Sequence, residues 1–183
     1  FDKLDIILNF DLIIVFGLDG IMLSVGRIAV DFNIPLLGVN RGRLGFLTDI
    51  LSYDMEVQLN RVLSGDYIIS HRFLLDISLL RNGTKVSSGE AINDVVLHPG
   101  SSLRMMEFEL YIDKKFVYSQ RSDGLIVSTP TGSTAYALSG GGPILHPNLE
   151  AIVLVQMNAH TLSSIPIVVG GNSDIEMKLA SRN

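Results

Sequence analysis

The sequence predicts an α/β domain over residues 1–65 and a β-rich domain over residues 66–183. In the first, apolar runs typical of buried parallel strands alternate with segments of helical spacing. After Gly65 the apolar period shortens from about 3.6 to about 2 residues, the spacing of strands. The dipeptide Asn82-Gly83 then separates two alternating segments, which indicates a β-hairpin.

The first domain contains a strand–helix–strand unit and a second helix. The run DLIIVF is short, continuous and rich in Ile, as buried strands are. Gly65 is expected to end the second helix as its C-terminal glycine. In chain order, we predict a strand at 11–16, a helix at 21–32, a strand at 34–39, a glycine-punctuated loop at 40–49 and a helix at 55–65.

The second domain is predicted to consist of strands with one short helix after a turn at 130–134. The clearest alternation is in MEFELYIDKKFVYSQ, where Asp113-Lys114-Lys115 forms the turn. The strand candidates are 72–86 (a hairpin pair), 90–98, 106–120 (a second pair), 124–129, 150–157, 165–169 and 174–179.

The composition is that of a packed globular protein. Hydrophobic residues make up 47% of the chain and charged residues 18%, so disorder is not expected. The net charge of −5, without a basic patch, argues against nucleic acid as a partner. Because cysteine is absent, disulfides and thiolate metal sites are excluded.

The mean hydropathy of +0.37 raises the question of a membrane segment. The long apolar stretch 12–30 contains Asp19 and Arg27, so no run reaches the length of a spanning helix. No signal-peptide pattern opens the chain. We therefore predict a cytoplasmic protein without a membrane partner. Because the chain begins at Phe1 and not at Met, we expect it to be a fragment.

The stretch GLDG (17–20) joins the first strand to the first helix. A glycine turn before a helix lets backbone N–H groups approach a phosphate, and the helix dipole favours the anion. Asp19 then has two interpretations. It caps a helix that begins near Ile21, or its carboxylate holds a metal ion or accepts a proton from a hydroxyl that attacks phosphorus.

Two further stretches suit polar ligand groups. Residues 128–134 contain five hydroxyl side chains at a predicted helix start. This segment is either an ordinary turn or a ligand site. The GGGP sequence at 140–143 that follows demands a specific backbone path. Asn93 and Asp94 interrupt a strand-like run, although both residue types are depleted in strands. Either a sheet bulge or two adjacent sugar hydroxyls would satisfy their hydrogen bonds.

Together these segments resemble the bacterial form of the NAD kinase family. The matching stretches are GLDGIML, NRGRLGFLTD, INDVVLHPG, RSDGLIVSTPTGSTAYALSGGGPILHP and HTLSSIPIVV, and they cover most of residues 11–169. The resemblance implies an NAD kinase-like fold with a β-sandwich-like C-terminal domain. It also implies an enzyme, a phosphotransferase that uses ATP to phosphorylate the adenosine ribose 2′-hydroxyl of NAD and so forms NADP. A divalent metal cation, Mg²⁺ by preference, and a homodimer or homotetramer are further implications.

The resemblance also assigns roles to individual residues. Asp19 falls on the family's proton acceptor, and Gly20 lies beside it at the ligand. Asn93 and Asp94 fall on the pair that holds the substrate ribose. The remaining ligand positions are Arg104, Arg121, Asp123 and the adenosine-pocket segment Thr134, Ala135, Tyr136, Ala137, Leu138 and Ser139.

The chain departs from the family pattern at several points. Leu18 replaces the second glycine of the family turn Gly-Gly-Asp-Gly, where a side chain crowds the phosphates or forbids a positive φ angle. Asn158-Ala159 stand where the family has Phe-Pro, and Asp94 replaces the commoner Glu. Family members extend further at both ends, so we expect the chain to be incomplete at both. The alternatives are a catalytically impaired NAD-binding protein of this fold and, less favoured, a lipid kinase of the superfamily.

Overall fold

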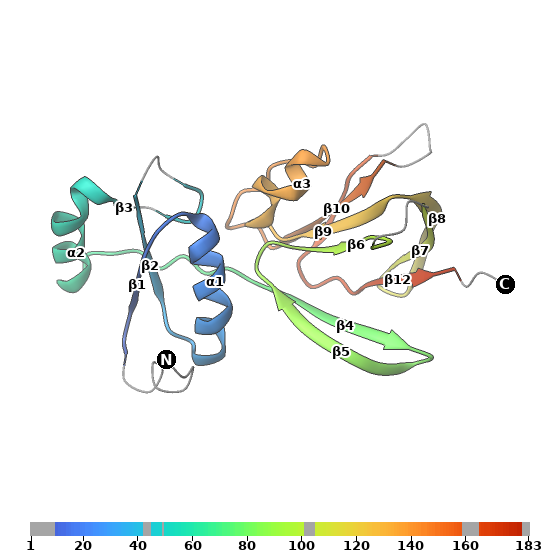
Figure 1. Cartoon of the computed structure of the whole chain (residues 1–183), viewed down its shortest axis with the longest axis horizontal. Coiled ribbons are helices and arrows are strands. Elements are labelled where there is room, and N and C mark those ends of the chain that lie inside the picture. The colour runs from blue at the N-terminus through green and yellow to red at the C-terminus, as the bar shows by residue number, and fades with distance from the viewer. Residues whose placement is uncertain (1–9, 42–44, 49, 101–104, 159–164, 181–183) are drawn as a thin grey trace. The chain divides into compact units, whose positions relative to one another are not determined.

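A computed structural model describes residues 10–41, 45–48, 50–100, 105–158 and 165–180 of the 183-residue chain. The chain forms two compact units, Phe1–Ser70 and His71–Asn183 (Figure 1). The first is α/β and the second is built mainly of strands, so the predicted fold class is confirmed. Within the described residues, no helix is long and apolar enough to cross a membrane.

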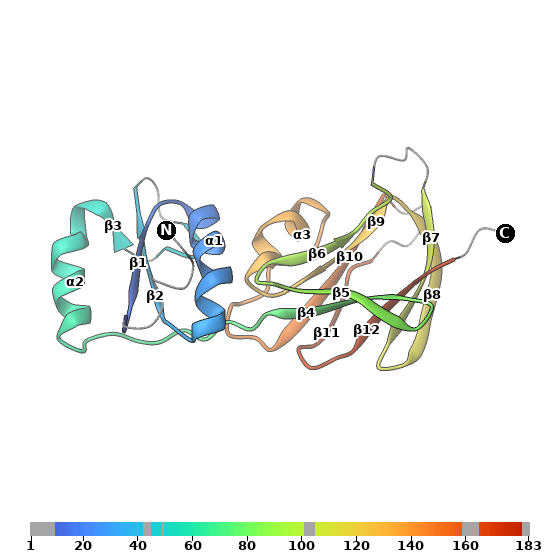
Figure 2. The ribbon, with the colours of Figure 1, turned by 60° about the horizontal axis from the view of Figure 1, so that its bottom comes forward.

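The first unit contains a three-stranded parallel sheet in the order β1-β2-β3. Helix α1 connects β1 to β2, as the strand–helix–strand pattern predicted. In both views, α1 and α2 lie on opposite sides of these strands (Figures 1 and 2). The elements are β1 (Ile13–Phe16), α1 (Asp19–Ala29), the 3₁₀ turn η1 (Val30–Phe32), β2 (Leu36–Asn40), β3 (Ile50–Leu51), η2 (Ser52–Asp54) and α2 (Met55–Leu63).

Two details of this unit differ from the sequence prediction. Helix α1 begins at Asp19, two residues before the predicted start. Strand β3 lies where no strand was predicted, because its two residues are too short to show a period. Its pairing of Ile50 with Val39, both buried, extends the sheet beyond β2.

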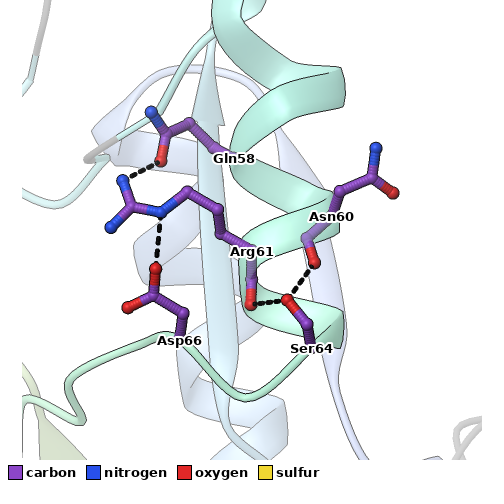
Figure 3. Close-up of polar contacts among 5 residues, drawn as sticks. All are labelled: Gln58, Asn60, Arg61, Ser64 and Asp66. Atoms are coloured by element: carbon purple, nitrogen blue, oxygen red, sulfur yellow. Dashed lines mark hydrogen bonds and ion pairs between the residues drawn. The ribbon is translucent and has the colours of Figure 1, made fainter.

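Helix α2 ends in a Schellman motif built around the predicted C-terminal glycine. Gly65 has a φ angle of +89°, and the Asp66 N–H donates to the Arg61 carbonyl at 2.9 Å. Figure 3 shows the side chains that reinforce this end: Arg61 Nε donates to Asp66 Oδ2 at 2.7 Å, and Ser64 Oγ donates to the Asn60 carbonyl at 2.7 Å. Hydrogen bonds among residues 60–66 are therefore sufficient to end the helix.

The described residues of the second unit form three antiparallel sheets, ordered β11-β10-β9-β6, β12-β7-β8 and β4-β5. Its strands are β4 (Leu75–Arg81), β5 (Thr84–Ala91), β6 (Asp94–Leu97), β7 (Met106–Ile112), β8 (Lys115–Ser122), β9 (Gly124–Ser128), β10 (Ala151–Met157), β11 (Ile167–Gly170) and β12 (Ile175–Leu179). Its helical elements are η3 (Gly132–Thr134) and α3 (Tyr136–Ser139).

The centre of this unit is the pair β9–β10, whose two faces serve two different cores. On one face, Leu125 and Leu154 pack with Phe108 of β7, which joins the two larger sheets as the β-sandwich-like prediction requires. On the other face, Ile126 and Val153 belong to a second cluster. Helix α3 covers this second face (Figures 1 and 2). The alternation of strand side chains places successive residues in opposite cores.

Both predicted hairpin turns are present. Asn82 and Gly83 have φ angles of 52° and 77°, and Asp113 and Lys114 have 51° and 65°, as the two central residues of type I′ turns require. Lys115, predicted to belong to the second turn, is instead the first residue of β8.

The predicted strand 90–98 is wrong as a single element. Strand β5 ends at Ala91 and β6 begins at Asp94, and the two belong to different sheets. The chain bends at Ile92 and Asn93 to pass from one sheet to the next. The polar pair therefore marks a sheet-to-sheet crossing, and the alternative of a bulge within one strand is also wrong.

The central core yields a stability prediction. Leu154 is 1% exposed, so Leu154→Ala is expected to lower the free energy of unfolding by about 2–5 kcal/mol through lost burial and a cavity. Leu79 of β4 is 56% exposed, and Leu79→Ala is the matched control, expected to cost under about 0.5 kcal/mol. Urea unfolding of the two variants measures the difference, and equal losses would contradict the assigned core.

Candidate functional site

The carboxylate of Asp19 is held by the backbone of a loop that follows β2. The Phe46 N–H donates to Asp19 Oδ2 at 2.8 Å, and the Leu47 N–H donates to Oδ1 at 3.1 Å. Asp19 is half-buried and is the first residue of α1, whose N-cap is Leu18. The capping interpretation of Asp19 is therefore wrong, because the residue lies inside the helix and its carboxylate is engaged by the loop.

The turn before α1 tolerates the leucine that replaces the family glycine. Leu18 has φ −91° and ψ 171°, an extended conformation open to any residue, so the expected conflict with a positive φ angle does not arise. Its side chain is 61% exposed. Gly20 is exposed as well, and a Cβ atom placed there would meet no atom within 4 Å. The helix start is thus open at Gly20.

The Asn93–Asp94 crossing and the hydroxyl-rich segment after β9 meet in the second unit. The Asn93 carbonyl accepts hydrogen bonds from the Thr129 N–H at 2.8 Å and from Ser128 Oγ at 3.1 Å. Thr129 Oγ1 donates to the Ile92 carbonyl at 2.6 Å. A Cβ atom on Gly132 would overlap the Asn93 carbonyl, so glycine is required there for close approach. The fold thereby brings two of the predicted site segments together.

This junction leaves one buried acceptor without a donor among the described residues, next to a second acceptor that is partly desolvated. Asn93 Oδ1 is buried and has no hydrogen-bond partner among the described residues. The neighbouring Asp94 carboxylate is half-buried, and burial raises its pKa above the ordinary value of 3.8. An unsatisfied buried acceptor calls for a donor from elsewhere. A ligand with two neighbouring hydroxyl groups supplies such donors.

The predicted adenosine-pocket segment divides into buried and exposed residues. The side chain of Ala137 is fully buried in the second core, whereas Tyr136 and Leu138 are 45% and 41% exposed. Ala137 anchors the short helix while its neighbours remain accessible. Thr134 and Ala135 are half-buried, and Ser139 is exposed.

The predicted GGGP constraint is visible at the end of α3. Gly141 has a φ angle of +87°, and the Gly142 N–H donates to the Ala137 carbonyl at 2.9 Å, which forms a second Schellman motif. A Cβ atom on Gly142 would lie 2.7 Å from a methyl group of Val155. Gly141 therefore allows the turn that ends α3, and Gly142 allows the close approach to β10.

Two of the charged ligand positions, Arg121 and Asp123, lie at the β8–β9 junction. Arg121 is exposed on β8. Asp123 Oδ2 accepts a hydrogen bond from Asn158 Nδ2 at 2.9 Å. Asn158 has a φ angle of 45°, a conformation that asparagine adopts more readily than most residues. Arg104 lies outside the described residues.

Sequence reasoning did not identify the backbone donors around Asp19, or Gly45 and Thr48 beside them. The sequence predicts the stretch GRLGFLTD only as a loop and as part of the family resemblance. No side-chain pattern reports that the N–H groups of Phe46 and Leu47 converge on a carboxylate far away in the sequence. Among the described residues, no cluster of three or more His, Cys, Asp or Glu side chains could hold a metal ion by itself.

Comparison with known proteins identifies the family of the chain. Two family models match: the ATP-NAD kinase N-terminal domain over residues 5–67 and the ATP-NAD kinase C-terminal domain over residues 92–183. The chain is similar to the NAD kinases of Teredinibacter turnerae (61% identical over 173 residues, 94% of this chain and 59% of that protein) and Hahella chejuensis (62% over 173 residues, 94% and 58%). The chain belongs to the ATP-NAD kinase family.

Solved structures of related enzymes share the fold. Yeast NADH kinase complexed with NADH superposes with a TM-score of 0.89 at 31% identity, covering 98% of this chain and 53% of that one. An NAD kinase from Archaeoglobus fulgidus in complex with ATP gives a TM-score of 0.77 at 29% identity, covering 93% and 66%. The chain spans 59% and 58% of the lengths of the two bacterial relatives.

The raised pKa of Asp94 predicts a pH-dependent stability. In the unfolded chain this carboxyl loses its proton at a lower pH than in the folded protein, so between the two pKa values stability falls as pH rises. The amide of Asp94→Asn does not titrate in this pH range, so the variant lacks this loss of stability. The free energy of unfolding of the variant, relative to the unchanged protein, should therefore increase from acid to neutral pH. Urea unfolding across that range tests this, and a difference that stays constant with pH would contradict it.

Proposed function

We propose that the protein transfers the γ-phosphoryl group of ATP to the 2′-hydroxyl of the adenosine ribose of NAD, which yields NADP and ADP. Membership of the ATP-NAD kinase family supports this proposal. So do the names of the bacterial relatives and the NADH and ATP bound in the two related structures.

The observation that carries the proposal is the pair of adjacent acceptors at the β5–β6 crossing. Asn93 Oδ1 is buried without a partner among the described residues, and the Asp94 carboxylate next to it is partly desolvated. Before reaction, the 2′- and 3′-hydroxyls of a ribose are neighbouring donors of matching number, and the 2′-hydroxyl turns its single proton to the general base as phosphoryl transfer begins. We assign this crossing to the adenosine ribose of NAD.

We propose that the remaining predicted positions also contact the substrates, NAD or ATP. Exposed or half-buried side chains near α3 present an accessible surface to an adenosine group, whereas Ala137 contributes through its backbone and its place in the core. The proposed contact residues are Gly20, Arg104, Arg121, Asp123, Thr134, Ala135, Tyr136, Leu138 and Ser139.

Asp19 is the proposed general base. As the ribose 2′-oxygen forms its bond to the γ-phosphorus, the hydroxyl proton moves to the Asp19 carboxylate, and the bond from that phosphorus to the β–γ bridging oxygen breaks to release ADP. Each carboxylate oxygen accepts one N–H from the loop, which leaves further lone-pair capacity for the proton. The open helix start at Gly20 suits the triphosphate.

A divalent cation, Mg²⁺ by preference, fits this donor set. Magnesium is usually bound through one or two carboxylates together with substrate phosphates, so a cluster of protein ligands is not required. When bound, such an ion neutralises charge on the transferring phosphoryl group. The half-buried Asp19 carboxylate is the group that would lie beside the ion.

We further propose that the protein is a cytoplasmic homodimer or homotetramer.

The ribose assignment predicts weaker NAD binding in Asn93→Ala. Removing this side chain leaves a ribose hydroxyl unpaired, so binding should weaken by about 1–3 kcal/mol. Asn60→Ala, an exposed change on α2, is the matched control and should leave the affinity unaltered. Calorimetric titration with NAD measures both, and equal affinities of Asn93→Ala and the unchanged protein would refute the assignment.

The general-base assignment predicts a loss of turnover in Asp19→Asn. The amide cannot take the proton, so turnover should fall by roughly 10²–10⁴. Because the amide has one acceptor oxygen, one loop N–H also loses its partner, and stability should drop by about 1 kcal/mol. Asp31→Asn, an exposed change in η1, is the matched control.

Formation of NADP and thermal melts distinguish the possible roles of Asp19. If it only held the loop, stability would fall while turnover per folded molecule stayed normal. If Asp19 acted only as a metal ligand, Asp19→Asn would lower turnover and also raise the magnesium concentration that the enzyme requires. Retention of more than about a tenth of the turnover in Asp19→Asn would refute the general-base role.

A further inference from the structure

We propose that Gly45 is a positioning residue for phosphoryl transfer, because its lack of a side chain allows the segment Gly45–Thr48 to hold both oxygens of the Asp19 carboxylate. This inference rests on the proposed function, in which Asp19 is the general base. It assigns the orientation of that base to a loop, and it makes the glycine a determinant of turnover and not of substrate binding.

The segment Gly45–Thr48 binds the Asp19 carboxylate through two backbone N–H donors. The N–H groups of two successive residues, Phe46 and Leu47, donate to different oxygens of Asp19 at 2.8 and 3.1 Å. Two bonds to two oxygens fix the plane of the carboxylate as well as its position. A base already held in its working orientation avoids reorganisation during the reaction.

Space, and not backbone conformation, requires glycine at position 45. The φ angle of Gly45 lies outside the left-handed region. A Cβ atom at this position would overlap Oδ1 of Asp19, and it would lie 2.9 Å from Asp19 Cγ and 2.8 Å from Thr48 Oγ1. Any side chain at position 45 therefore competes directly with the carboxylate.

The far side of Gly45 is closed by a buried anchor. Thr48 is fully buried, and its hydroxyl accepts a hydrogen bond from Asn40 Nδ2 at 2.9 Å at the end of β2. Asn40 is itself 1% exposed. Because this anchor is enclosed, a side chain on residue 45 is accommodated by displacement of the Asp19 carboxylate or of its two donors. Either movement misplaces the base.

The first test compares Gly45→Ala with Gly89→Ala. At Gly89, an exposed residue of β5, a Cβ atom would meet nothing within 4 Å, so this variant is the matched control and should be unchanged. Gly45→Ala is expected to lower kcat for NADP formation by about 10- to 100-fold, since small misplacements of reacting groups have effects of this size. The KM values for NAD and ATP should stay within about threefold, because uniform binding is untouched.

A double-variant cycle separates positioning from a merely structural effect. In the Asp19→Asn background, Gly45→Ala should lower the residual kcat by less than about twofold, because the group it positions is already absent. An unchanged kcat in the single variant, or an equal fold-loss in both backgrounds, would overturn the proposal. Failure of the proposed function gives a different result. The single variant Asp19→Asn would then retain its kcat, with glycine or alanine at position 45.

A second variant covers the case in which Gly45→Ala does not fold. Phe46→Pro removes the N–H that donates to Asp19 Oδ2, and the phenylalanine side chain itself is 66% exposed. It is expected to lower kcat by about 10-fold or more with KM values little changed. Normal kcat in folded Phe46→Pro protein would overturn the inference.

Discussion

The double burial of the β9–β10 pair is the constraint on which the second unit depends. All five residues of β9 are buried, because alternate side chains enter two cores on opposite faces. The sandwich core needs a second sheet on one face, and the other face needs a cover. Helix α3 provides that cover through Ala137, and Gly140 and Gly142 after it allow close approach to Val155 of β10. The packing thus decides which side chains of the 134–139 segment are exposed.

Backbone groups hold both candidate site segments. At the β5–β6 crossing, the Asn93 carbonyl is bound by Ser128 and Thr129, which leaves the Asn93 side-chain oxygen available. At the start of α1, the Asp19 carboxylate is bound by two loop N–H groups. Hydrogen bonds that involve the main chain hold both segments without occupying other titratable groups. The phosphoryl transfer proposed for this protein therefore requires few side chains.

Much of the fold was predictable from local pattern. The Asn82-Gly83 turn, the helix end at Gly65 and the strands β9 and β10 follow from residue type and period. The errors occurred where pattern is weak. Strand β3 has two residues, and the run 90–98 has a continuous strand-like composition although it crosses between sheets at Ile92 and Asn93. Period alone does not report which sheet a residue joins.

The sequence by itself determined the family, the order of α/β and β-rich parts, and the candidate residues Asp19, Asn93 and Asp94, since these depend on residue types at fixed spacing. Only the tertiary structure decided how those residues are held. The loop donors to Asp19 come from residues 46 and 47, and the bonds at Asn93 come from residues 128 and 129. Backbone N–H and carbonyl groups are nearly identical along a chain, so only folding reveals which of them meet.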